Sequence, residues 1–354
     1  MAERCQRCQV LPYVADEPKQ LFCVFPLDVI KEKFKNFLRE HGCEFLDEGE
    51  FLGFEVESLK SFIAKLTNSG IFSNVEYNDI HCVVLDRNVP LTISAFKSLK
   101  PLSTWTALVE AEEYLEMLSD GRLTVYFQPV IDVRKHKVVG FELLARGVGK
   151  DGSIVPPSQL FESAKKTDTL FYLDRACREV AVKMAAVKKL NNYMIFINFT
   201  PTAIYDPQFC LKDTVEWATQ LHLDPKNLVF EVVESEKVED LRHLKSILDY
   251  YRSKGFRVAL DDVGSGYSNL NVIVELKPDI IKIDREIIRN VHEDKVKSAV
   301  LEALVKIARD SGIGVLAEGV ETLEEFDFIK DKVDLAQGYL FGKPTPEPVR
   351  VVNI

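Results

Sequence analysis

The first hundred residues mix short apolar runs of strand length with stretches of helical period. Strands repeat every two residues and amphipathic helices about every 3.6, so this mixture predicts a small α+β domain over residues 1–100. Prolines at 90 and 101 interrupt the pattern, and apolar positions over 105–118 then return at helical spacing, which predicts a linker helix within 101–120. The small domain is expected to hold strands at 21–25, 51–56 and 80–85 and helices at 27–41 and 59–66.

After Gly121 the chain alternates apolar strands with helices. About eight strands over about 230 residues predict a (β/α)8 TIM-like barrel at 121–354, with an open doubly wound sheet as the competing architecture. The turn at 134–137 is short enough to make the first two strands antiparallel neighbours. The expected strands are 125–128, ended by Pro129, then 138–144, 194–198, 228–234, 257–261, 280–284, 315–318 and 335–337. The expected helices are 160–190 with a break near Asp168, 213–221, 241–254, 295–310 and 323–330.

Composition narrows the class of protein. The chain has 354 residues, 46% of them apolar, and a net charge of -10, which disfavours broad contact with a large nucleic acid. No apolar run approaches the about 20 residues of a membrane segment, and the polar N-terminus lacks a signal-peptide core, so we expect a cytoplasmic protein.

The cysteines carry a second, weaker signal. Their odd number, seven, and scattered positions favour reduced thiols over a disulfide framework. Cys5 and Cys8 have the spacing of half a zinc site, but no second pair with this spacing follows, and we favour the interpretation that they bind no metal. Completing such a site would need ligands from Cys23, His41, Cys43, His81 and Cys82.

Polar residues interrupt most of the apolar barrel strands. Asp261 and Asp262 end one strand, and the glycines at 264 and 266 would let both carboxylates reach one point. Each polar residue alone is explained by a turn or a salt bridge, but a barrel gathers its strand ends around one axis. Five acids would converge there with one lysine, and oxygen ligands select Mg²⁺ or Mn²⁺, with enough ligands for two ions. The residues are Glu142, Asn198, Glu231, Asp261, Asp262, Lys282, Glu318 and Gln337.

These residues lie in motifs that resemble the EAL-domain phosphodiesterases of the bacterial second messenger cyclic di-GMP. Glu142-Leu143-Leu144 stands where that family has Glu-Ala-Leu, and the likeness covers about residues 110–350 in order and spacing. Further matching segments are Asn198-Phe199-Thr200, 231–234, 261–268, 282–284, 317–322 and 337–344.

The resemblance implies a barrel with one antiparallel strand that hydrolyses cyclic di-GMP to linear pGpG with two divalent metals. One ion would bind Glu142, Asn198, Glu231 and Asp261, and the other Asp261 and Asp262 with Glu318 nearby. Lys282, Glu318 and Glu231 would act in catalysis, with Lys282 positioning the water or acting on its proton. Glu234 would anchor the 263–270 loop, and the dinucleotide groove would be lined by Gln128, Leu144, Arg146, Gln337 and Pro344. Members of the family commonly form homodimers through their barrels.

Two departures from the family lie in the loop after the paired acids: Val263 replaces the usual Phe, and Asn269 the usual Ser. They leave two alternatives to an active phosphodiesterase. One is a catalytically weak cyclic di-GMP receptor, and the other is a scaffold that works through residues 1–100. The complete set of metal ligands favours the enzyme.

Overall fold

The computed structural model describes residues 6–12, 17–233, 241–264 and 270–352. The chain divides into two compact units, which are described separately: residues 1–121 with 158–172, and residues 122–157 with 173–354. Among the described residues, no helix combines the length and the apolar character that a membrane crossing needs.

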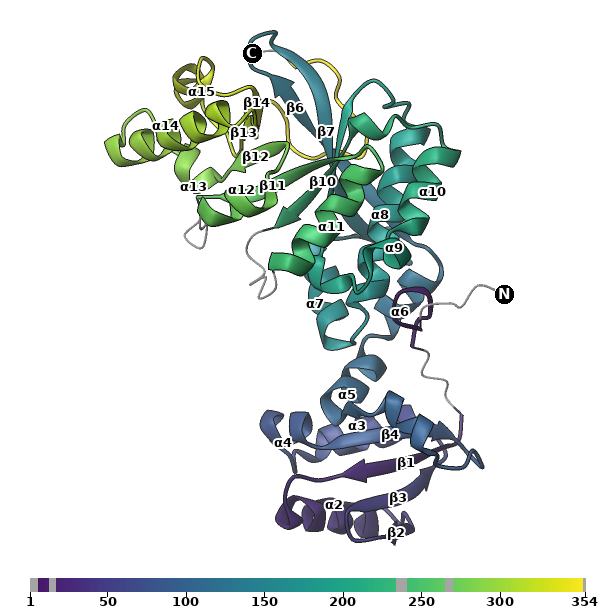
Figure 1. Ribbon diagram of the computed structural model, residues 1–354. Helices are drawn as coiled ribbons and strands as arrows, with labels where there is room; N and C mark the ends of the chain where they lie inside the picture. Colours follow the sequence, from purple (N-terminus) through teal and green to yellow (C-terminus); the bar gives the residue numbers. More distant parts are fainter. Residues whose placement is uncertain (1–5, 13–16, 234–240, 265–269, 353–354) are drawn as a thin grey trace. The chain divides into compact units, whose positions relative to one another are not determined.

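The first unit is built on an antiparallel sheet of order β2-β3-β1-β4-β5 (Figure 1). Its apolar residues from β1, β3, α2 and α3 form one core, with Leu21, Phe34 and Leu66 fully buried. Ser58 caps the start of α3 and Gly70 ends it in the left-handed conformation, which confirms the expected α+β unit. Its strands are β1 (Lys19–Val24), β2 (Phe45–Asp47), β3 (Phe51–Val56), β4 (His81–Asp86) and β5 (Lys100–Pro101). Its helices are α1 (Gln6–Gln9), α2 (Asp28–Glu40), α3 (Leu59–Ser69), α4 (Asn74–Asp79), η1 (Ile93–Ser98), α5 (Leu102–Glu110) and α6 (Glu112–Ser119).

The expected linker helix is two helices, α5 and α6. They meet at Ala111, whose backbone leaves the helical region at φ -93° and ψ 28°. The prediction of one continuous helix was wrong, and no proline or glycine at this point signals the break.

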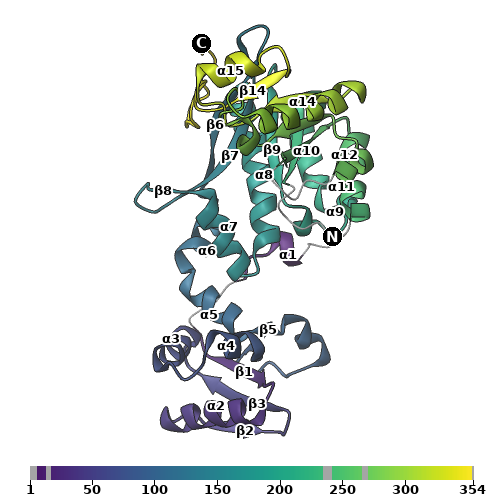
Figure 2. The same cartoon turned by 90° about the vertical axis from the view of Figure 1, so that its left-hand side faces the viewer.

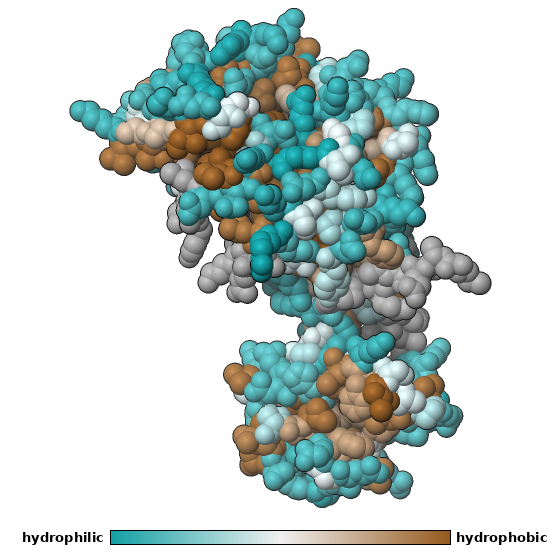
Figure 3. All heavy atoms as spheres, viewed as in Figure 1, coloured by the Kyte–Doolittle hydropathy of each residue, from teal (hydrophilic) through white to brown (hydrophobic). Residues whose placement is uncertain are grey.

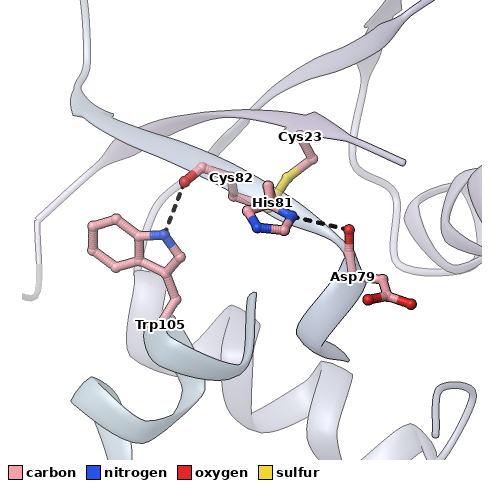
Figure 4. Close-up of a disulfide and its surroundings, with 5 residues drawn as sticks. All are labelled: Cys23, Asp79, His81, Cys82 and Trp105. Atoms are coloured by element: carbon pink, nitrogen blue, oxygen red, sulfur yellow. Dashed lines mark hydrogen bonds between the residues drawn. A yellow bond between two sulfur atoms is a disulfide. The ribbon is translucent and has the colours of Figure 1, made fainter. Parts of the chain in front are cut away.

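A disulfide links Cys23 on β1 to Cys82 on β4 (Figure 4). The two residues are direct partners in the antiparallel register, which brings side chains on one face close together. The Nε1 of Trp105 on α5 donates to the carbonyl oxygen of Cys82 at 3.0 Å. The expectation of reduced thiols was wrong for this pair, because its cysteines are 59 residues apart and no local pattern reveals the pairing.

The disulfide also removes two of the sulfur ligands that a zinc site with Cys8 would have needed. Among the described residues, Cys8, Cys43, Cys177 and Cys210 take no part in this disulfide, and Cys5 lies outside the described residues.

The second unit is a closed barrel of eight strands, which excludes the open doubly wound sheet. The sheet order is β6-β14-β13-β12-β11-β10-β9-β7-β8, and an additional pairing of β6 with β7 closes the ring. β6 is antiparallel to both of its neighbours, whereas the pairs from β7 through β14 around the ring are parallel. The strands are β6 (Leu123–Asp132), β7 (Lys137–Val148), β8 (Ile154–Val155), β9 (Met194–Phe199), β10 (Leu228–Val233), β11 (Arg257–Val263), β12 (Ile280–Ile283), β13 (Gly314–Ala317) and β14 (Leu335–Gln337).

Helices surround these strands on the outer side (Figures 1 and 2). Tyr251 of α11, for example, stacks on Phe230 of β10 with ring centroids 4.0 Å apart. The expected break near Asp168 is present between α7 and α8, and Asp168 has a φ of 55°. α7 (Pro157–Lys166) falls almost entirely within the first unit. The helical segments of the second unit are α8 (Leu170–Val187), η2 (Pro201–Ala203), α9 (Pro207–Cys210), α10 (Lys212–Gln220), η3 (Pro225–Asn227), α11 (Leu241–Ser253), α12 (Leu270–Leu276), α13 (Arg285–Ile288), α14 (Lys295–Asp310) and α15 (Leu323–Ile329).

Pro129 does not end its strand as expected. It pairs with Phe141 in register, and β6 continues to Asp132. The missing N–H is tolerated because Pro129 lies between two groups of partners: Phe127 exchanges backbone hydrogen bonds with Thr345, and β14 pairs from Val130 onward.

A layer of apolar side chains fills the inside of the barrel, separate from the larger core between strands and helices. Seven strands contribute one residue each: Val130, Phe196, Val229, Ala259, Ile280, Leu316 and Leu335.

Candidate active site

The candidate site is the next layer inside the barrel, toward the carboxyl ends of the parallel strands. Side chains two residues apart on a strand point to the same face. Six strands therefore place a polar residue directly beyond an apolar one of the inner layer: Asn198 after Phe196, Glu231 after Val229, Asp261 after Ala259, Lys282 after Ile280, Glu318 after Leu316 and Gln337 after Leu335. Glu142 of β7 joins this layer because its carboxylate accepts hydrogen bonds from Asn198 and Gln337.

A β-bulge brings Asp261 and Asp262 to one side of β11. The register with β12 shifts between Leu260 and Val263, and Asp262 has a φ of 56°. The sequence predicts that the glycines after the pair turn both carboxylates toward one point. In the structure, the departure from regular strand geometry already begins at Asp262. Asp261, Asp262 and Glu318 each place a carboxylate oxygen within 4.8 Å of the others, a separation that fits a shared cation.

Lys282 lies at the centre of the acids and is almost fully buried. Its Nζ is 2.9 Å from Glu231 Oε1, 3.0 Å from Asp261 Oδ1 and 2.7 Å from Glu318 Oε1. Burial disfavours the charge, but the surrounding carboxylates, led by Asp261, raise the pKa of Lys282 well above its ordinary value. In this cluster the side chain therefore favours its charged form.

One ammonium does not neutralise five carboxyl groups. Burial raises the pKa of Glu231 and of Glu318 well above the ordinary value, with the neighbouring acids adding to the effect. Burial, followed by the charges of Asp261 and Asp284, raises the pKa of Asp262 to about 6. Without further positive charge nearby, these three carboxyl groups are protonated more readily than carboxyl groups in water.

Glu231 provides a direct test of whether a cation fits. Its side chain is fully buried, and neither carboxylate oxygen accepts a hydrogen bond from any described residue. Lys282 contacts one oxygen as an ion pair, without the geometry of a hydrogen bond. A buried carboxylate with unfilled acceptor positions, among hard oxygen donors, suits Mg²⁺ or Mn²⁺.

Glu142 is held by two amides. Asn198 Nδ2 donates to its Oε1 at 2.8 Å, and Gln337 Nε2 donates to its Oε2 at 2.7 Å. Gln337, expected in the substrate groove, is buried and orients this carboxylate. Asn198 uses its Nδ2 here, which leaves its Oδ1 as the amide atom available to a cation.

The other expected groove residues lie on the β6–β7 hairpin or beside it. Gln128 pairs with Glu142, and the alternating positions Tyr126, Leu144 and Arg146 share that face. The guanidinium of Arg146 lies 5.0 Å from the ring centroid of Tyr126 and donates to the carbonyl of Ala145. Sequence reasoning missed Tyr126, although its spacing of two from Gln128 could have found it.

Of the four remaining residues singled out from the sequence, two lie in the described part of the barrel and two do not. Pro344 precedes Thr345, whose backbone bonds to Phe127 of β6, so it lies beside the hairpin. Val263 is buried in the core between strands and helices. Glu234 and Asn269 lie outside the described residues.

Comparison with curated proteins finds relatives that share this part of the chain. The probable cyclic di-GMP phosphodiesterase PdeG of Escherichia coli K12 is 32% identical over 231 residues, which cover 64% of this chain and 45% of PdeG. The cyclic di-GMP phosphodiesterase PdeL of the same organism is 28% identical over 243 residues, covering 68% of this chain and 67% of PdeL. The chain spans less than half the length of the first five curated relatives that it matches.

Solved structures show the same fold. A standalone EAL protein from Vibrio cholerae O395, crystallised with c-di-GMP bound, is 38% identical and covers 65% of this chain and 95% of its own, with a TM-score of 0.59. Klebsiella pneumoniae BlrP1, in a manganese and cyclic di-GMP complex, is 22% identical, with a TM-score of 0.59. It covers 94% of this chain and 98% of its own, so the likeness of fold reaches into the first unit.

A sequence model described as the EAL domain matches residues 111–344, the region that forms the barrel and its polar layer. The chain belongs to the EAL domain family.

Proposed function

We propose that this protein is a metal-dependent phosphodiesterase that hydrolyses cyclic di-GMP to linear pGpG and so lowers the level of the second messenger. The observation that carries the proposal is the polar layer. It holds the carboxylates that we propose as metal ligands around a buried lysine, and one of them, Glu231, is a buried carboxylate with unfilled acceptor positions. Cyclic di-GMP is proposed as the substrate because relatives are named as cyclic di-GMP phosphodiesterases and similar EAL structures contain bound c-di-GMP.

The proposed metal ligands form two overlapping groups. Asp261 belongs to both, with Glu142, Asn198 and Glu231 on one side and Asp262 and Glu318 on the other. Bound Mg²⁺ or Mn²⁺ would lower the pKa of a coordinated water and stabilise negative charge on the phosphate.

The protein side chains supply orientation and charge. Lys282 keeps a fixed positive charge among Glu231, Asp261 and Glu318, where its Nζ can position the attacking water by donating to it. Arg146 can leave the carbonyl oxygen of Ala145 and form a forked contact with two phosphate oxygens. Gln128, Leu144 and Pro344 would line the groove for the dinucleotide.

The test is incubation of the purified protein with cyclic di-GMP and Mg²⁺ or Mn²⁺, followed by nucleotide chromatography. We expect pGpG to accumulate and excess EDTA to stop its formation. Cyclic di-GMP that binds but stays intact would instead establish the weak receptor. Undiminished turnover in EDTA would contradict metal dependence.

Assembly into a homodimer and a cytoplasmic location stay predictions. Val274 on α12 and Val296 and Val300 on α14 are exposed apolar side chains, and we place the contact between two barrels on these two helices. Figure 3 shows hydrophobic side chains gathered over this region of the second unit. The role of Glu234 as a loop anchor also stays a prediction.

A further inference from the structure

A buried ion pair lies outside the polar layer, on α8, whose residues Ala181, Val182 and Ala185 belong to the core of the barrel unit. Asp174 and Arg178, four residues apart on α8, are each 2% exposed. Arg178 Nε and Nη2 both lie 3.0 Å from Asp174 Oδ2. Arg178 Nη1 donates to the hydroxyl of Thr214 on α10, so the guanidinium is fixed from two sides.

The second oxygen of Asp174 reaches the backbone just beyond the candidate site. Its Oδ1 accepts a hydrogen bond from the N–H of Thr200 at 2.7 Å, and both groups are buried. Thr200 is two residues past Asn198 and stands between the end of β9 and the turn that begins at Pro201. A buried N–H beyond the end of a strand needs a partner, and Asp174 provides it.

Stability alone does not account for this pair. Burying two charges costs desolvation free energy, and apolar side chains of similar size often stabilise a fold as well or better. What apolar side chains lack is an oxygen that accepts from the Thr200 N–H. The pair therefore supplies an acceptor at a fixed place, with Arg178 orienting the carboxylate.

We propose that Asp174, fixed by Arg178, is a positioning residue that sets the backbone at Thr200 and thereby aims the Asn198 amide at the metal site. The inference rests on the proposed function, in which Asn198 Oδ1 is a ligand. Asn198 Nδ2 already donates to Glu142 at 2.8 Å, so a shift of the backbone at 198–200 displaces the amide and loosens Glu142 with it.

Two double variants separate the acceptor from the charge pair. The first variant, Asp174→Leu with Arg178→Met, removes the hydrogen-bond acceptor and the charge pair. The second, Asp174→Asn with Arg178→Met, removes the charges but keeps an oxygen that can accept from the Thr200 N–H. Mn²⁺ binding to each protein, freed of metal beforehand, is measured by calorimetry, and folding is checked by thermal unfolding. We expect the Leu/Met variant to bind Mn²⁺ about tenfold or more weakly, and the Asn/Met variant to stay close to the parent.

Equal Mn²⁺ affinity in the parent and the Leu/Met variant would overturn the inference, and so would an equal loss in both variants. A third variant, Thr214→Val, loosens Arg178 but keeps the acceptor, and it guards against poor folding of the Leu/Met protein. We expect its Mn²⁺ affinity to match the parent, and a tenfold loss there would also overturn the inference. If the parent protein binds Mn²⁺ but does not hydrolyse cyclic di-GMP, the proposed function is wrong. The comparison of Mn²⁺ affinities between the parent and its variants stays valid in that case.

Discussion

Asp262 adopts a left-handed backbone, with φ at 56°, where glycine would be unstrained. Aspartate tolerates this region better than most residues, yet it still costs more there than glycine. The bulge that imposes the conformation also turns the carboxylate toward Asp261 and Glu318. The backbone conformation alone would favour glycine at this position, so we attribute the aspartate to the negative charge that it brings to the site.

The ionisation of Asp262 predicts how metal binding depends on pH. The folded-state pKa of about 6 lies above the ordinary 3.8, so the carboxyl is ionised above about pH 6 and protonated below it. A cation must displace that proton at low pH, and the pKa values of Glu231 and Glu318 are raised as well, so we expect Mn²⁺ affinity to fall by about tenfold or more for each pH unit below 6. Calorimetry at several pH values measures this slope. An affinity that does not change between about pH 7.5 and about pH 5 would contradict the assignment.

Lys282 predicts a separate effect on stability. Replacing it by Met leaves Glu231, Asp261 and Glu318 without their counter-charge, because all three contact its Nζ. We expect the metal-free Lys282→Met protein to lose about 3 kcal/mol of unfolding free energy in urea, partly restored by Mn²⁺. Lys306→Met, which breaks an exposed pair with Asp310, is the control and should cost less than about 1 kcal/mol. Equal effects of the two substitutions would disprove the central role of Lys282.

Strand alternation made most of the barrel predictable at the scale of elements. The apolar runs predicted all eight ring strands, and the polar residue at the end of six of them marked the site. The features missed by sequence depend on tertiary contacts: β6 continues past Pro129 because Thr345 and β14 supply its partners, and α8 meets Thr200 only in the folded chain. The bulge in β11 likewise has no local sequence signal besides the Asp pair itself.

The link between β1 and β4 predicts a redox effect on the first unit. Cys23 and Cys82 are 59 residues apart. A cross-link that closes a loop of this length lowers the conformational entropy of the unfolded chain, which stabilises the folded state by up to about 4 kcal/mol. We expect a reductant to lower the unfolding free energy of this unit by up to that amount. Thiol titration in denaturant should find two fewer thiols before reduction than after it. A Cys23→Ala, Cys82→Ala protein should be insensitive to reductant, and identical thiol counts in the parent would contradict the disulfide.

In the described part of the chain, each unit has a large hydrophobic core of its own, and the barrel also has its inner apolar layer. The core of the first unit is formed by residues between Leu21 and Leu102, and that of the second by residues between Val125 and Phe341. The first unit could be predicted from sequence as α+β, but its own role could not, because its apolar pattern specifies packing rather than chemistry. The resemblance to known phosphodiesterases rests on the barrel.

Separate cores predict separate unfolding. We expect differential scanning calorimetry of the full chain to show two transitions, of which Mn²⁺ raises only the one that belongs to the barrel, because a ligand stabilises the unit that binds it. A single transition that Mn²⁺ shifts as a whole would show that the two units unfold together. Deleting residues 1–100 then tests coupling, since unchanged turnover and oligomeric state would rule it out.

The central claim is that the polar layer of the barrel hydrolyses cyclic di-GMP, and Asp262→Asn tests it most directly. Asparagine tolerates the left-handed backbone and keeps the size of the side chain, so the fold should persist while one carboxylate charge is lost. Single-turnover hydrolysis and cyclic di-GMP affinity are measured beside the parent at matched thermal stability. We expect the rate to fall by about a thousandfold or more with binding largely retained. A folded Asp262→Asn protein that still hydrolyses cyclic di-GMP within a few-fold of the parent would contradict the account.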